Sequence, residues 1–198
     1  MAAVGILGGT FDPIHVGHLI IAEAARDQLE LDRIEFLPAN DPPHKPDDTV
    51  SSAQRRAAMI EAAIANAVHF SLNGMELERS GPSYTVDTLE LLTGTRPRDE
   101  FCFIIGGDSL RDLPSWRSPR KILSLATLAV IDRPGARYDL DALEQALPGL
   151  RDRVRFVSAP LIDISATSLR SNIAAGKSVR FQTPDTVIAF ISAHGLYR

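Results

Sequence analysis

A short apolar run, Val4–Leu7, leads directly into the segment GGTFDPIHVGH at residues 8–18, and this junction constrains the fold more than any other part of the sequence. Two glycines let the backbone turn sharply and approach a ligand closely. Pro13 stiffens the loop before a helical pattern begins near Gly17. The junction therefore predicts a strand, a tight loop and the start of a helix. Because the N–H groups and the dipole at a helix start favour an anion, the loop is a predicted phosphate site.

Two histidines, His15 and His18, stand at the predicted start of this helix. Side chains three residues apart in a helix share one face, so the two imidazoles can converge on the same oxygen atoms. Each ring can donate a hydrogen bond while neutral and would add positive charge if protonated, and the sequence leaves open which form acts. The alternative is a glycine-rich turn whose histidines only cap the helix.

The bulk composition predicts one domain over residues 1–198. A chain of 198 residues with 44% apolar residues can bury a sizeable core. The formal charge of −4 argues against a nucleic-acid-binding protein, which normally carries a basic surface. We therefore expect no nucleic-acid partner, and any phosphate site must be local.

The sequence also predicts a soluble, cytoplasmic protein with no membrane partner. The first apolar stretch ends at Gly8, too early for a signal sequence, and the longest apolar run, Ile122–Ile131, falls short of the ~20 residues that a spanning helix needs. The only cysteine, Cys102, lies inside an apolar run, which excludes an internal disulfide and indicates core packing in a reducing compartment. The oligomeric state, including a homo-oligomer, is left open.

Apolar runs alternate with amphipathic stretches along the chain, and this alternation predicts βαβ units and an α/β fold with a doubly wound parallel sheet. Strands are expected at Val4–Leu7, Ile34–Leu37, Val68–Leu72, Phe101–Ile105, Leu128–Ile131 and Val154–Val157, several of them apolar on both faces. Helices are expected at Gly17–Glu30, Ala53–Ala65, Val86–Leu92, Pro119–Ala126, Asp139–Leu147, Ser168–Ala175 and Pro184–His194.

Local signals mark several helix ends. Ser118 is a predicted N-cap with Pro119 at the first helical position, and Ser51 with Gln54 forms a predicted capping box. Ligands of a parallel sheet bind at the carboxyl ends of its strands. The segments rich in polar groups follow strands, so we expect them at one edge of the sheet: residues 8–18, 38–45 and 106–116. The proline-rich segment 38–46 is either a solvated connection or a functional lid.

The segment 8–18 resembles the signature of the HxGH nucleotidyltransferases, a Rossmann-like superfamily that transfers a nucleotidyl group from a nucleoside triphosphate. Further segments narrow the resemblance to the bacterial nicotinate-nucleotide adenylyltransferases: PPHK at 42–45, SYT at 83–85, GGD at 106–108 followed by Trp116, and ISATSLR at 164–170. The resemblance implies a Rossmann-like core over about residues 1–160 and a helical C-terminal segment over about 161–198 that completes the ATP site. The implied reaction joins ATP and nicotinate mononucleotide to give deamido-NAD and pyrophosphate, in NAD biosynthesis.

The resemblance implies that His18 and His15 are the catalytic residues, with His18 placed to stabilise the α-phosphate of ATP during transfer. No protein nucleophile is needed, because catalysis comes from alignment of the reactants and from donors aimed at developing charge. Gly8, Gly9 and Thr10 are expected at the phosphates. Thr10 can also be an ordinary residue at the start of a helix.

A second phosphate-binding arm is expected at Ser165, Thr167 and Arg170, where hydroxyls precede a helix. A guanidinium suits this site because it can bind two oxygen atoms at once. The alternative is that Thr167 or Ser168 is only an N-cap and Arg170 a solvated charge. Lys45 is expected to bring a positive charge to the phosphates, or else to be a surface lysine.

Binding of the nicotinate nucleotide is expected at Ser83, Tyr84, Thr85 and Trp116. Thr85 precedes a predicted helix whose backbone N–H groups could receive the nicotinate carboxylate. Trp116 could stack on the positively charged pyridine ring, or be a half-buried packing residue. Many family members carry an aromatic residue where this chain has Arg117, which leaves the details of the ring pocket open.

Gly106 and Asp108 follow a predicted strand and are expected at the ribose and phosphates of ATP or at its magnesium. A carboxylate there could accept ribose hydroxyls or hold a metal-bound water. No His, Cys and Asp cluster has the spacing of a dedicated metal site, so Mg²⁺ is expected to arrive with ATP. Asp12, in an Asp-Pro pair, is expected to shape the turn.

Other functions remain open on the sequence. One is another adenylyltransferase of the same superfamily, with nicotinamide mononucleotide or pantetheine phosphate as acceptor; Ser83, Tyr84, Thr85 and Trp116 argue against the second. Another is a nucleotide-binding sensor without turnover. A third, a tRNA-handling fragment, fits poorly with the acidic balance.

Overall fold

A computed structural model describes residues 1–40, 51–79, 81–132 and 138–198. Its centre is a six-stranded parallel sheet in the order β3-β2-β1-β4-β5-β6. The strands are β1 (Ala3–Gly9), β2 (Arg33–Pro38), β3 (Phe70–Leu72), β4 (Glu100–Gly106), β5 (Thr127–Asp132) and β6 (Val154–Ser158). This order is that of a doubly wound Rossmann-like sheet, so the predicted fold class is confirmed.

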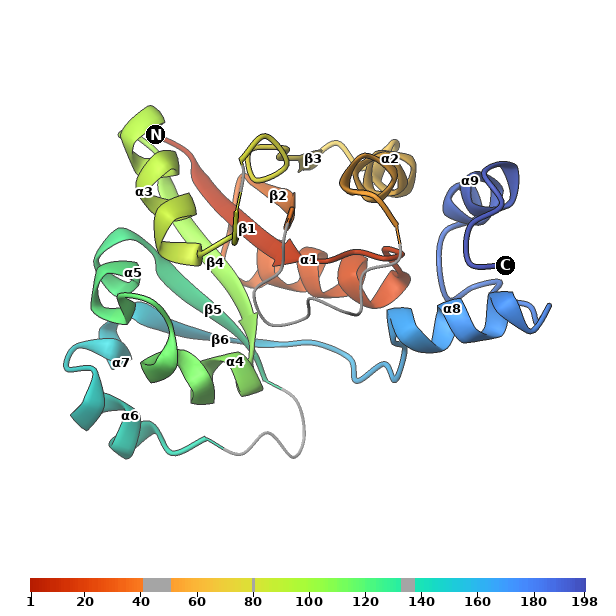
Figure 1. Ribbon diagram of the computed structural model, residues 1–198. Helices are drawn as coiled ribbons and strands as arrows, with labels where there is room; N and C mark the ends of the chain where they lie inside the picture. Colours follow the sequence, from red (N-terminus) through yellow and green to blue (C-terminus); the bar gives the residue numbers. More distant parts are fainter. Residues whose placement is uncertain (41–50, 80, 133–137) are drawn as a thin grey trace.

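The helices follow the strands in alternation (Figure 1). They are α1 (Val16–Gln28), α2 (Ala53–Ile64), α3 (Thr85–Thr95), α4 (Gly107–Asp112), the 3-10 turn Leu113–Ser115, α5 (Pro119–Leu125), α6 (Leu140–Ala146), α7 (Leu150–Arg153), α8 (Ala166–Ala174) and α9 (Asp185–Ala193).

The strands are apolar on both faces because each face of the sheet buries its own core. In β4, Phe101 and Phe103 pack with residues of α3, α4 and α5, whereas Cys102 and Ile104 pack on the opposite face with residues of α1, α2 and α9. Cys102 is buried as expected, and burial raises the pKa of its thiol to about 11. This thiol is therefore a packing group with little thiolate character.

The polar segments gather where expected, at the carboxyl ends of the central strands. β1 lies between β2 and β4, and the chain leaves β1 toward one face of the sheet and β4 toward the other. Gly9 pairs in register with Pro38, and Gly106 ends the neighbouring strand β4. This is the point where the strand order reverses, and it opens the crevice in which doubly wound sheets bind ligands.

The C-terminal helices α8 and α9 lie beside the β1–α1 loop, beyond the edge of the sheet (Figure 1). The α8–α9 connection holds the loop directly: the Val16 N–H donates to the Gln182 carbonyl at 3.0 Å, and the Thr183 hydroxyl donates to the Ile14 carbonyl at 2.7 Å. The Thr186 hydroxyl donates to the Ala62 carbonyl of α2 at 2.6 Å. The end of the chain is thereby fixed against its beginning.

Several local predictions need correction. The N-cap of α2 is Ser52, whose hydroxyl accepts the Arg55 N–H, so the predicted Ser51–Gln54 capping box is wrong. Ser51 is buried and hydrogen-bonds to Asp12 and Tyr197 instead. Ser118 does occupy the N-cap of α5, but its side chain makes no capping hydrogen bond and its backbone is left-handed. α8 begins two residues earlier than predicted because Ser165 caps it, accepting the Ser168 N–H at 3.1 Å.

Strand β3 is shorter than the predicted Val68–Leu72, and Val68 is exposed. β3 pairs only with β2, so this edge of the sheet supports three residues of strand. The short helices α4 and α7 were not predicted, since neither is long enough to show a helical period.

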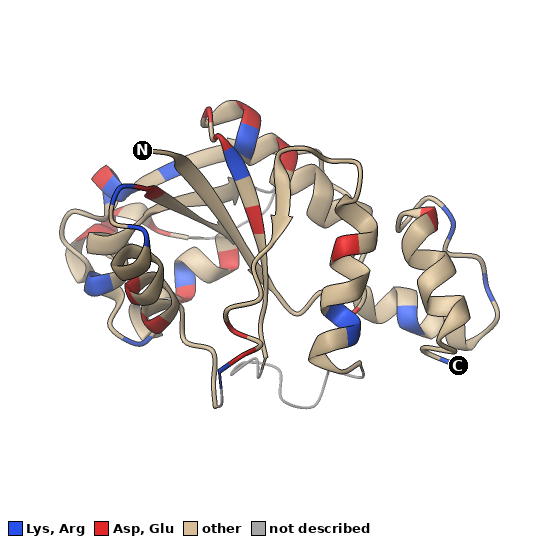
Figure 2. Cartoon of the chain, turned by 90° about the horizontal axis from the view of Figure 1, so that it is seen from above, with Lys and Arg blue, Asp and Glu red and all other residues tan. Residues whose placement is uncertain are grey.

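Within the described residues, every helix is too short or too polar to cross a membrane. Acidic and basic residues are interspersed over the helices and loops around the sheet (Figure 2). This mixing accords with a formal charge of only −4 over the chain.

Candidate active site

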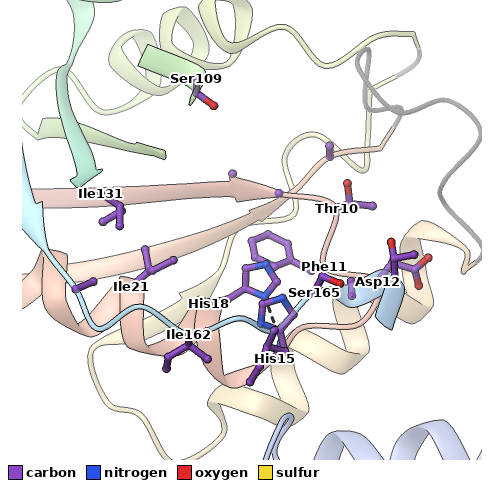
Figure 3. Close-up of a pocket in the computed structure, with 18 of the residues that line it drawn as sticks. Thr10, Phe11, Asp12, His15, His18, Ile21, Ser109, Ile131, Ile162 and Ser165 are labelled. Carbon is purple, nitrogen blue, oxygen red and sulfur yellow. Dashed lines mark hydrogen bonds between the residues drawn. The ribbon is translucent and has the colours of Figure 1, made fainter. Parts of the chain in front are cut away.

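A cavity of about 570 Å³ opens at the carboxyl end of β1. Its walls come from the β1–α1 loop, the end of β5, the segment before α8 and the first turns of α8 (Figure 3). The lining residues used below are Gly8, Gly9, Thr10, Phe11, Asp12, His15, His18, Ser109, Ser165, Thr167 and Arg170. Six of the nine predicted phosphate-binding residues and both predicted catalytic histidines therefore line this one cavity.

His15 and His18 lie together in this cavity (Figure 3). Their rings stack with centroids 3.7 Å apart, and the edge of Phe11 contacts His18 with centroids at 4.9 Å. His15 is the N-cap of α1 and is 8% exposed, while His18 sits one turn along. The helix geometry that the spacing predicted is thus present.

A backbone hydrogen bond fixes the chemistry of the His18 ring. The His15 N–H donates to Nδ1 of His18 at 3.2 Å. Because Nδ1 is then an acceptor, a neutral His18 carries its proton on Nε2. The ring is therefore held as a donor at its outer nitrogen, which is the atom that a phosphate oxygen would need.

The start of α8 forms the opposite wall. Nη1 of Arg170 donates to the Asp12 carbonyl at 2.8 Å, and Nη2 lies 3.4 Å from the Thr167 hydroxyl. Arg170 is therefore held beside the β1–α1 loop, 158 positions away in sequence. Ser165 lines the same cavity and also caps α8. The two readings of the hydroxyl segment, capping and ligand binding, are compatible for this residue.

A second cavity of about 270 Å³ adjoins the first across Gly8 and Gly9. It is lined by the predicted acceptor residues Ser83, Thr85 and Trp116, together with Gly106. Thr85 is the first residue of α3. The start of this helix and the indole therefore face one space, separated from the histidines by two glycines.

Tyr84 and Arg117 lie outside this second lining. Tyr84 is the N-cap residue of α3 and its ring packs against the core. The Arg117 guanidinium lies 4.9 Å from the centre of the Tyr84 ring and 3.1 Å from an Asp87 oxygen. Arg117 is therefore a cation that contacts the start of α3 from outside the cavity.

Two polar lining residues, Glu76 and Ser109, were not singled out by the sequence analysis. Glu76 lines the second cavity although it is 5% exposed; it accepts from the Thr88 hydroxyl at 2.5 Å and from Ser83. Burial raises the pKa of Glu76, and the hydroxyl donors oppose this shift. Ser109 borders both cavities. A lone Glu in a polar segment carries no signal, whereas Ser109 follows a motif residue and could have been inferred.

Asp108 and Lys45 are the two predicted phosphate-binding residues that the described cavity linings do not include. The Asp108 side chain is 83% exposed and pairs with Arg111 at 3.0 Å, outside both linings. Its predicted contact with ATP or magnesium remains a prediction. Lys45 lies outside the described residues. Over the part of the chain that the structure describes, no three His, Cys, Asp or Glu side chains are grouped to hold a metal ion.

The family described as cytidylyltransferase-like matches residues 6–172. A protein of Thermomicrobium roseum named "Probable nicotinate-nucleotide adenylyltransferase" is 45% identical over 100% of this chain and 92% of its own length. One of the same name from Roseiflexus sp. strain RS-1 is 47% identical, covering 100% and 98%.

Among solved structures, the chain resembles the Plasmodium falciparum nicotinic acid mononucleotide adenylyltransferase complexed with NaAD. The TM-score is 0.80 at 20% identity, with 100% of this chain and 98% of that chain covered. At this identity the likeness concerns the fold. It agrees with the strand order described above.

Proposed function

The chain belongs to the cytidylyltransferase-like nucleotidyltransferases, and on this premise we propose that it transfers AMP from ATP to nicotinate mononucleotide, releasing pyrophosphate and forming deamido-NAD. The identity of 45% and 47% to full-length relatives bearing the name of this activity supports the assignment. The two adjoining cavities supply the places that two nucleotides require.

The single observation that carries the proposal is the junction of these cavities at Gly8 and Gly9. ATP would occupy the larger cavity, with its phosphates between His18 and Arg170. Nicotinate mononucleotide would occupy the smaller one, with its ring against Trp116 and its carboxylate toward the start of α3. Two glycines let both nucleotides approach the backbone at the point where they meet.

In the reaction, a 5′-phosphate oxygen of nicotinate mononucleotide attacks the α-phosphorus of ATP. A new P–O bond forms, and the bond from the α-phosphorus to the bridging oxygen of the pyrophosphate group breaks. The protein holds the reactants in line and donates hydrogen bonds to the charge that builds on the phosphate oxygens. Nε2 of His18 is the donor for the α-phosphate, and Arg170 with Ser165 and Thr167 receives the leaving pyrophosphate.

Magnesium enters with ATP as part of the substrate. Mg²⁺ keeps several waters and is commonly held by substrate phosphates and one or two carboxylates. The histidine, hydroxyl and guanidinium groups of the cavity would contact the phosphate oxygens rather than the ion. Asp108 is the predicted carboxylate near the ribose and phosphates. A cytoplasmic location, expected from the single cysteine, also remains a prediction.

The direct test measures pyrophosphate release with ATP and Mg²⁺ and one acceptor at a time. We expect release with nicotinate mononucleotide, and far less with nicotinamide mononucleotide or pantetheine phosphate. A preference for either of the other acceptors would replace the proposed substrate. Nucleotide binding without release for any acceptor would support the sensor alternative.

A further inference from the structure

A buried cluster lies behind the β1–α1 loop, outside both cavities except for Asp12. Its members come from three distant parts of the chain: Asp12 in the loop, Ser51 and Arg56 at the start of α2, and Tyr197 next to the C-terminus. Arg56 and Asp12 are each 1% exposed. A buried charge is costly unless its hydrogen-bonding groups are satisfied, so this cluster requires an explanation beyond packing.

The guanidinium of Arg56 donates hydrogen bonds to backbone carbonyls in three segments of the chain. Nη1 donates to the Thr10 carbonyl at 2.8 Å, Nε to the Ser51 carbonyl at 3.3 Å and Nη2 to the Asn40 carbonyl at 3.4 Å. Burial lowers the pKa of Arg56, and the negative charge of Asp12 offsets part of this shift. The side chain thus links α2 and the end of β2 to the loop.

Tyr197 reaches the same loop from the other end of the chain. Its hydroxyl donates to Oδ1 of Asp12 at 2.5 Å, across 185 positions, and accepts from the Ser51 hydroxyl at 3.1 Å. The Ser51 N–H donates to Oδ2 of Asp12 at 3.2 Å. Burial and the adjacent Asp12 raise the pKa of Tyr197, so its hydroxyl remains a proton donor throughout the neutral range.

These contacts determine which way the loop presents its backbone. In a trans peptide the C=O and the following N–H point in opposite directions. Arg56 draws the Thr10 carbonyl to the α2 side, and this sets the direction of the Phe11 N–H. Thr10 and Phe11 both line the larger cavity. The buried cluster therefore sets the direction of a backbone donor in the loop that lines the larger cavity.

We propose that Arg56 and Tyr197 are positioning residues that hold the β1–α1 loop in the shape that binds the ATP phosphates. Neither side chain lines either of the two cavities described above, so each would act through the loop rather than on substrate. The inference rests on the proposed function, because it assigns ATP to the larger cavity. Its consequence is that the last residues of the chain control binding at the first loop.

The test uses the full chain with Tyr197→Phe and Arg56→Lys. Tyr197→Phe keeps the ring and removes only the hydroxyl, while Arg56→Lys keeps the charge but cannot reach three carbonyls. The matched controls are Tyr138→Phe, on the side of the sheet distant from the loop, and Arg55→Lys, an exposed neighbour on α2. Kinetics are measured with ATP varied and then with nicotinate mononucleotide varied, alongside thermal unfolding and calorimetric binding of ATP.

For both variants we expect kcat to fall about 10- to 100-fold, the loss that misplacement of reacting groups by about an ångström causes, with weaker ATP binding. The KM for nicotinate mononucleotide should change less than twofold, and both controls should match the wild type. A merely structural role would lower the unfolding temperature and leave the kinetic constants of the folded fraction unchanged.

Tyr197→Phe decides the matter if Arg56→Lys does not fold. Wild-type kcat and ATP affinity in folded Tyr197→Phe would overturn the proposal, as would equal weakening of both substrates. If the wild type itself gives no pyrophosphate with nicotinate mononucleotide, the proposed function fails instead, and ATP calorimetry on the same variants still tests the positioning role.

Discussion

The Arg170 guanidinium donates to the backbone carbonyl of Asp12 at 2.8 Å, joining the first loop of the chain to the helix that begins at Ala166. The two segments are 158 positions apart, yet His18 and Arg170 line one cavity. Had they faced separate cavities, a shared triphosphate would have been impossible. Their meeting in one cavity is the structural basis for the predictions on Arg170 and His18 below.

Replacing Arg170 should weaken the binding of ATP and leave the binding of nicotinate mononucleotide unchanged. Arg170→Lys keeps a positive charge but loses the planar fork that binds two oxygens, so we expect the KM for ATP to rise about tenfold. The KM for nicotinate mononucleotide should stay unchanged. Arg180→Lys is the matched control, because Arg180 stacks on the exposed Phe181 away from the cavity. Equal effects of the two substitutions would refute the assigned role of Arg170.

The hydrogen bond from His15 N–H to Nδ1 of His18 predicts different results for two amide substitutions of His18. His18→Gln can place an N–H near the position of Nε2, whereas His18→Asn reaches only the position of Nδ1. Loss of one donor to developing charge costs about 10²- to 10³-fold in kcat, so we expect that loss for Asn and a smaller one for Gln. Single-turnover rates at saturating ATP measure the difference. Identical rates for Gln and Asn would show that donation from Nε2 is not what His18 contributes.

Replacing Trp116 should weaken the binding of the acceptor nucleotide and leave the binding of ATP unchanged. Stacking and cation–π attraction to a pyridinium ring are worth about 0.5–2 kcal/mol, so Trp116→Ala should raise the KM for nicotinate mononucleotide roughly 2- to 30-fold. Trp116→Phe keeps an aromatic face and should lose less. Because Trp116 also packs against the core, unfolding temperatures accompany the kinetics. A rise confined to the KM for ATP would place the acceptor elsewhere.

The sequence predicted the strands and the strand–loop–helix junction at residues 8–18 because both depend on local patterns. β1, β4 and β5 are apolar on both faces, and the GGTFDPIHVGH segment combines turn, helix start and donors within eleven residues. The convergence of His18 with Arg170 followed from a resemblance, since no local pattern sets a distance between residues so far apart. The strand order then brought the predicted segments to one edge.

What escaped prediction depends on tertiary contacts. Arg56 lies in a helical pattern beside another arginine, where a charged residue is normally solvated, and its burial arises only when three segments meet around it. The sequence pattern around Ser51 predicts an N-cap, but Ser51 hydrogen-bonds to Asp12 and Tyr197 instead. Ser52 therefore caps α2. Glu76 similarly gains its role from Thr88 and Ser83.

Acid stability should depend on Glu35, which is buried on β2. Burial alone would raise its pKa, but hydrogen bonds from Arg96 and Asn73 hold the pKa of Glu35 below its usual value. Because the folded pKa is the lower one, this stabilisation is present above the unfolded pKa of about 4.3 and is lost as pH falls through the folded pKa.

Glu35 also pairs with Arg33 at 3.1 Å, and both Arg33 and Arg96 are partly exposed. Glu35→Gln should therefore lower the free energy of unfolding at pH 7 by about 2 kcal/mol, which is below the usual cost of breaking a fully buried pair. Its stability should also fall less steeply than that of the wild type below about pH 4.3. Urea unfolding between pH 3 and pH 7 measures both effects, with Glu23→Gln as the control from an exposed pair. Parallel pH profiles for Glu35→Gln and the wild type would contradict this assignment.

The central claim is that two nucleotides meet across Gly8 and Gly9 and react in line, without a covalent intermediate on the protein. The stereochemical course at phosphorus tests it most directly. The substrates are nicotinate mononucleotide and an ATP in which sulfur replaces one non-bridging oxygen of the α-phosphate, with known configuration at that phosphorus. One direct in-line displacement predicts inversion of configuration in the dinucleotide product. Retention would require two successive displacements through a protein nucleophile and would contradict the account.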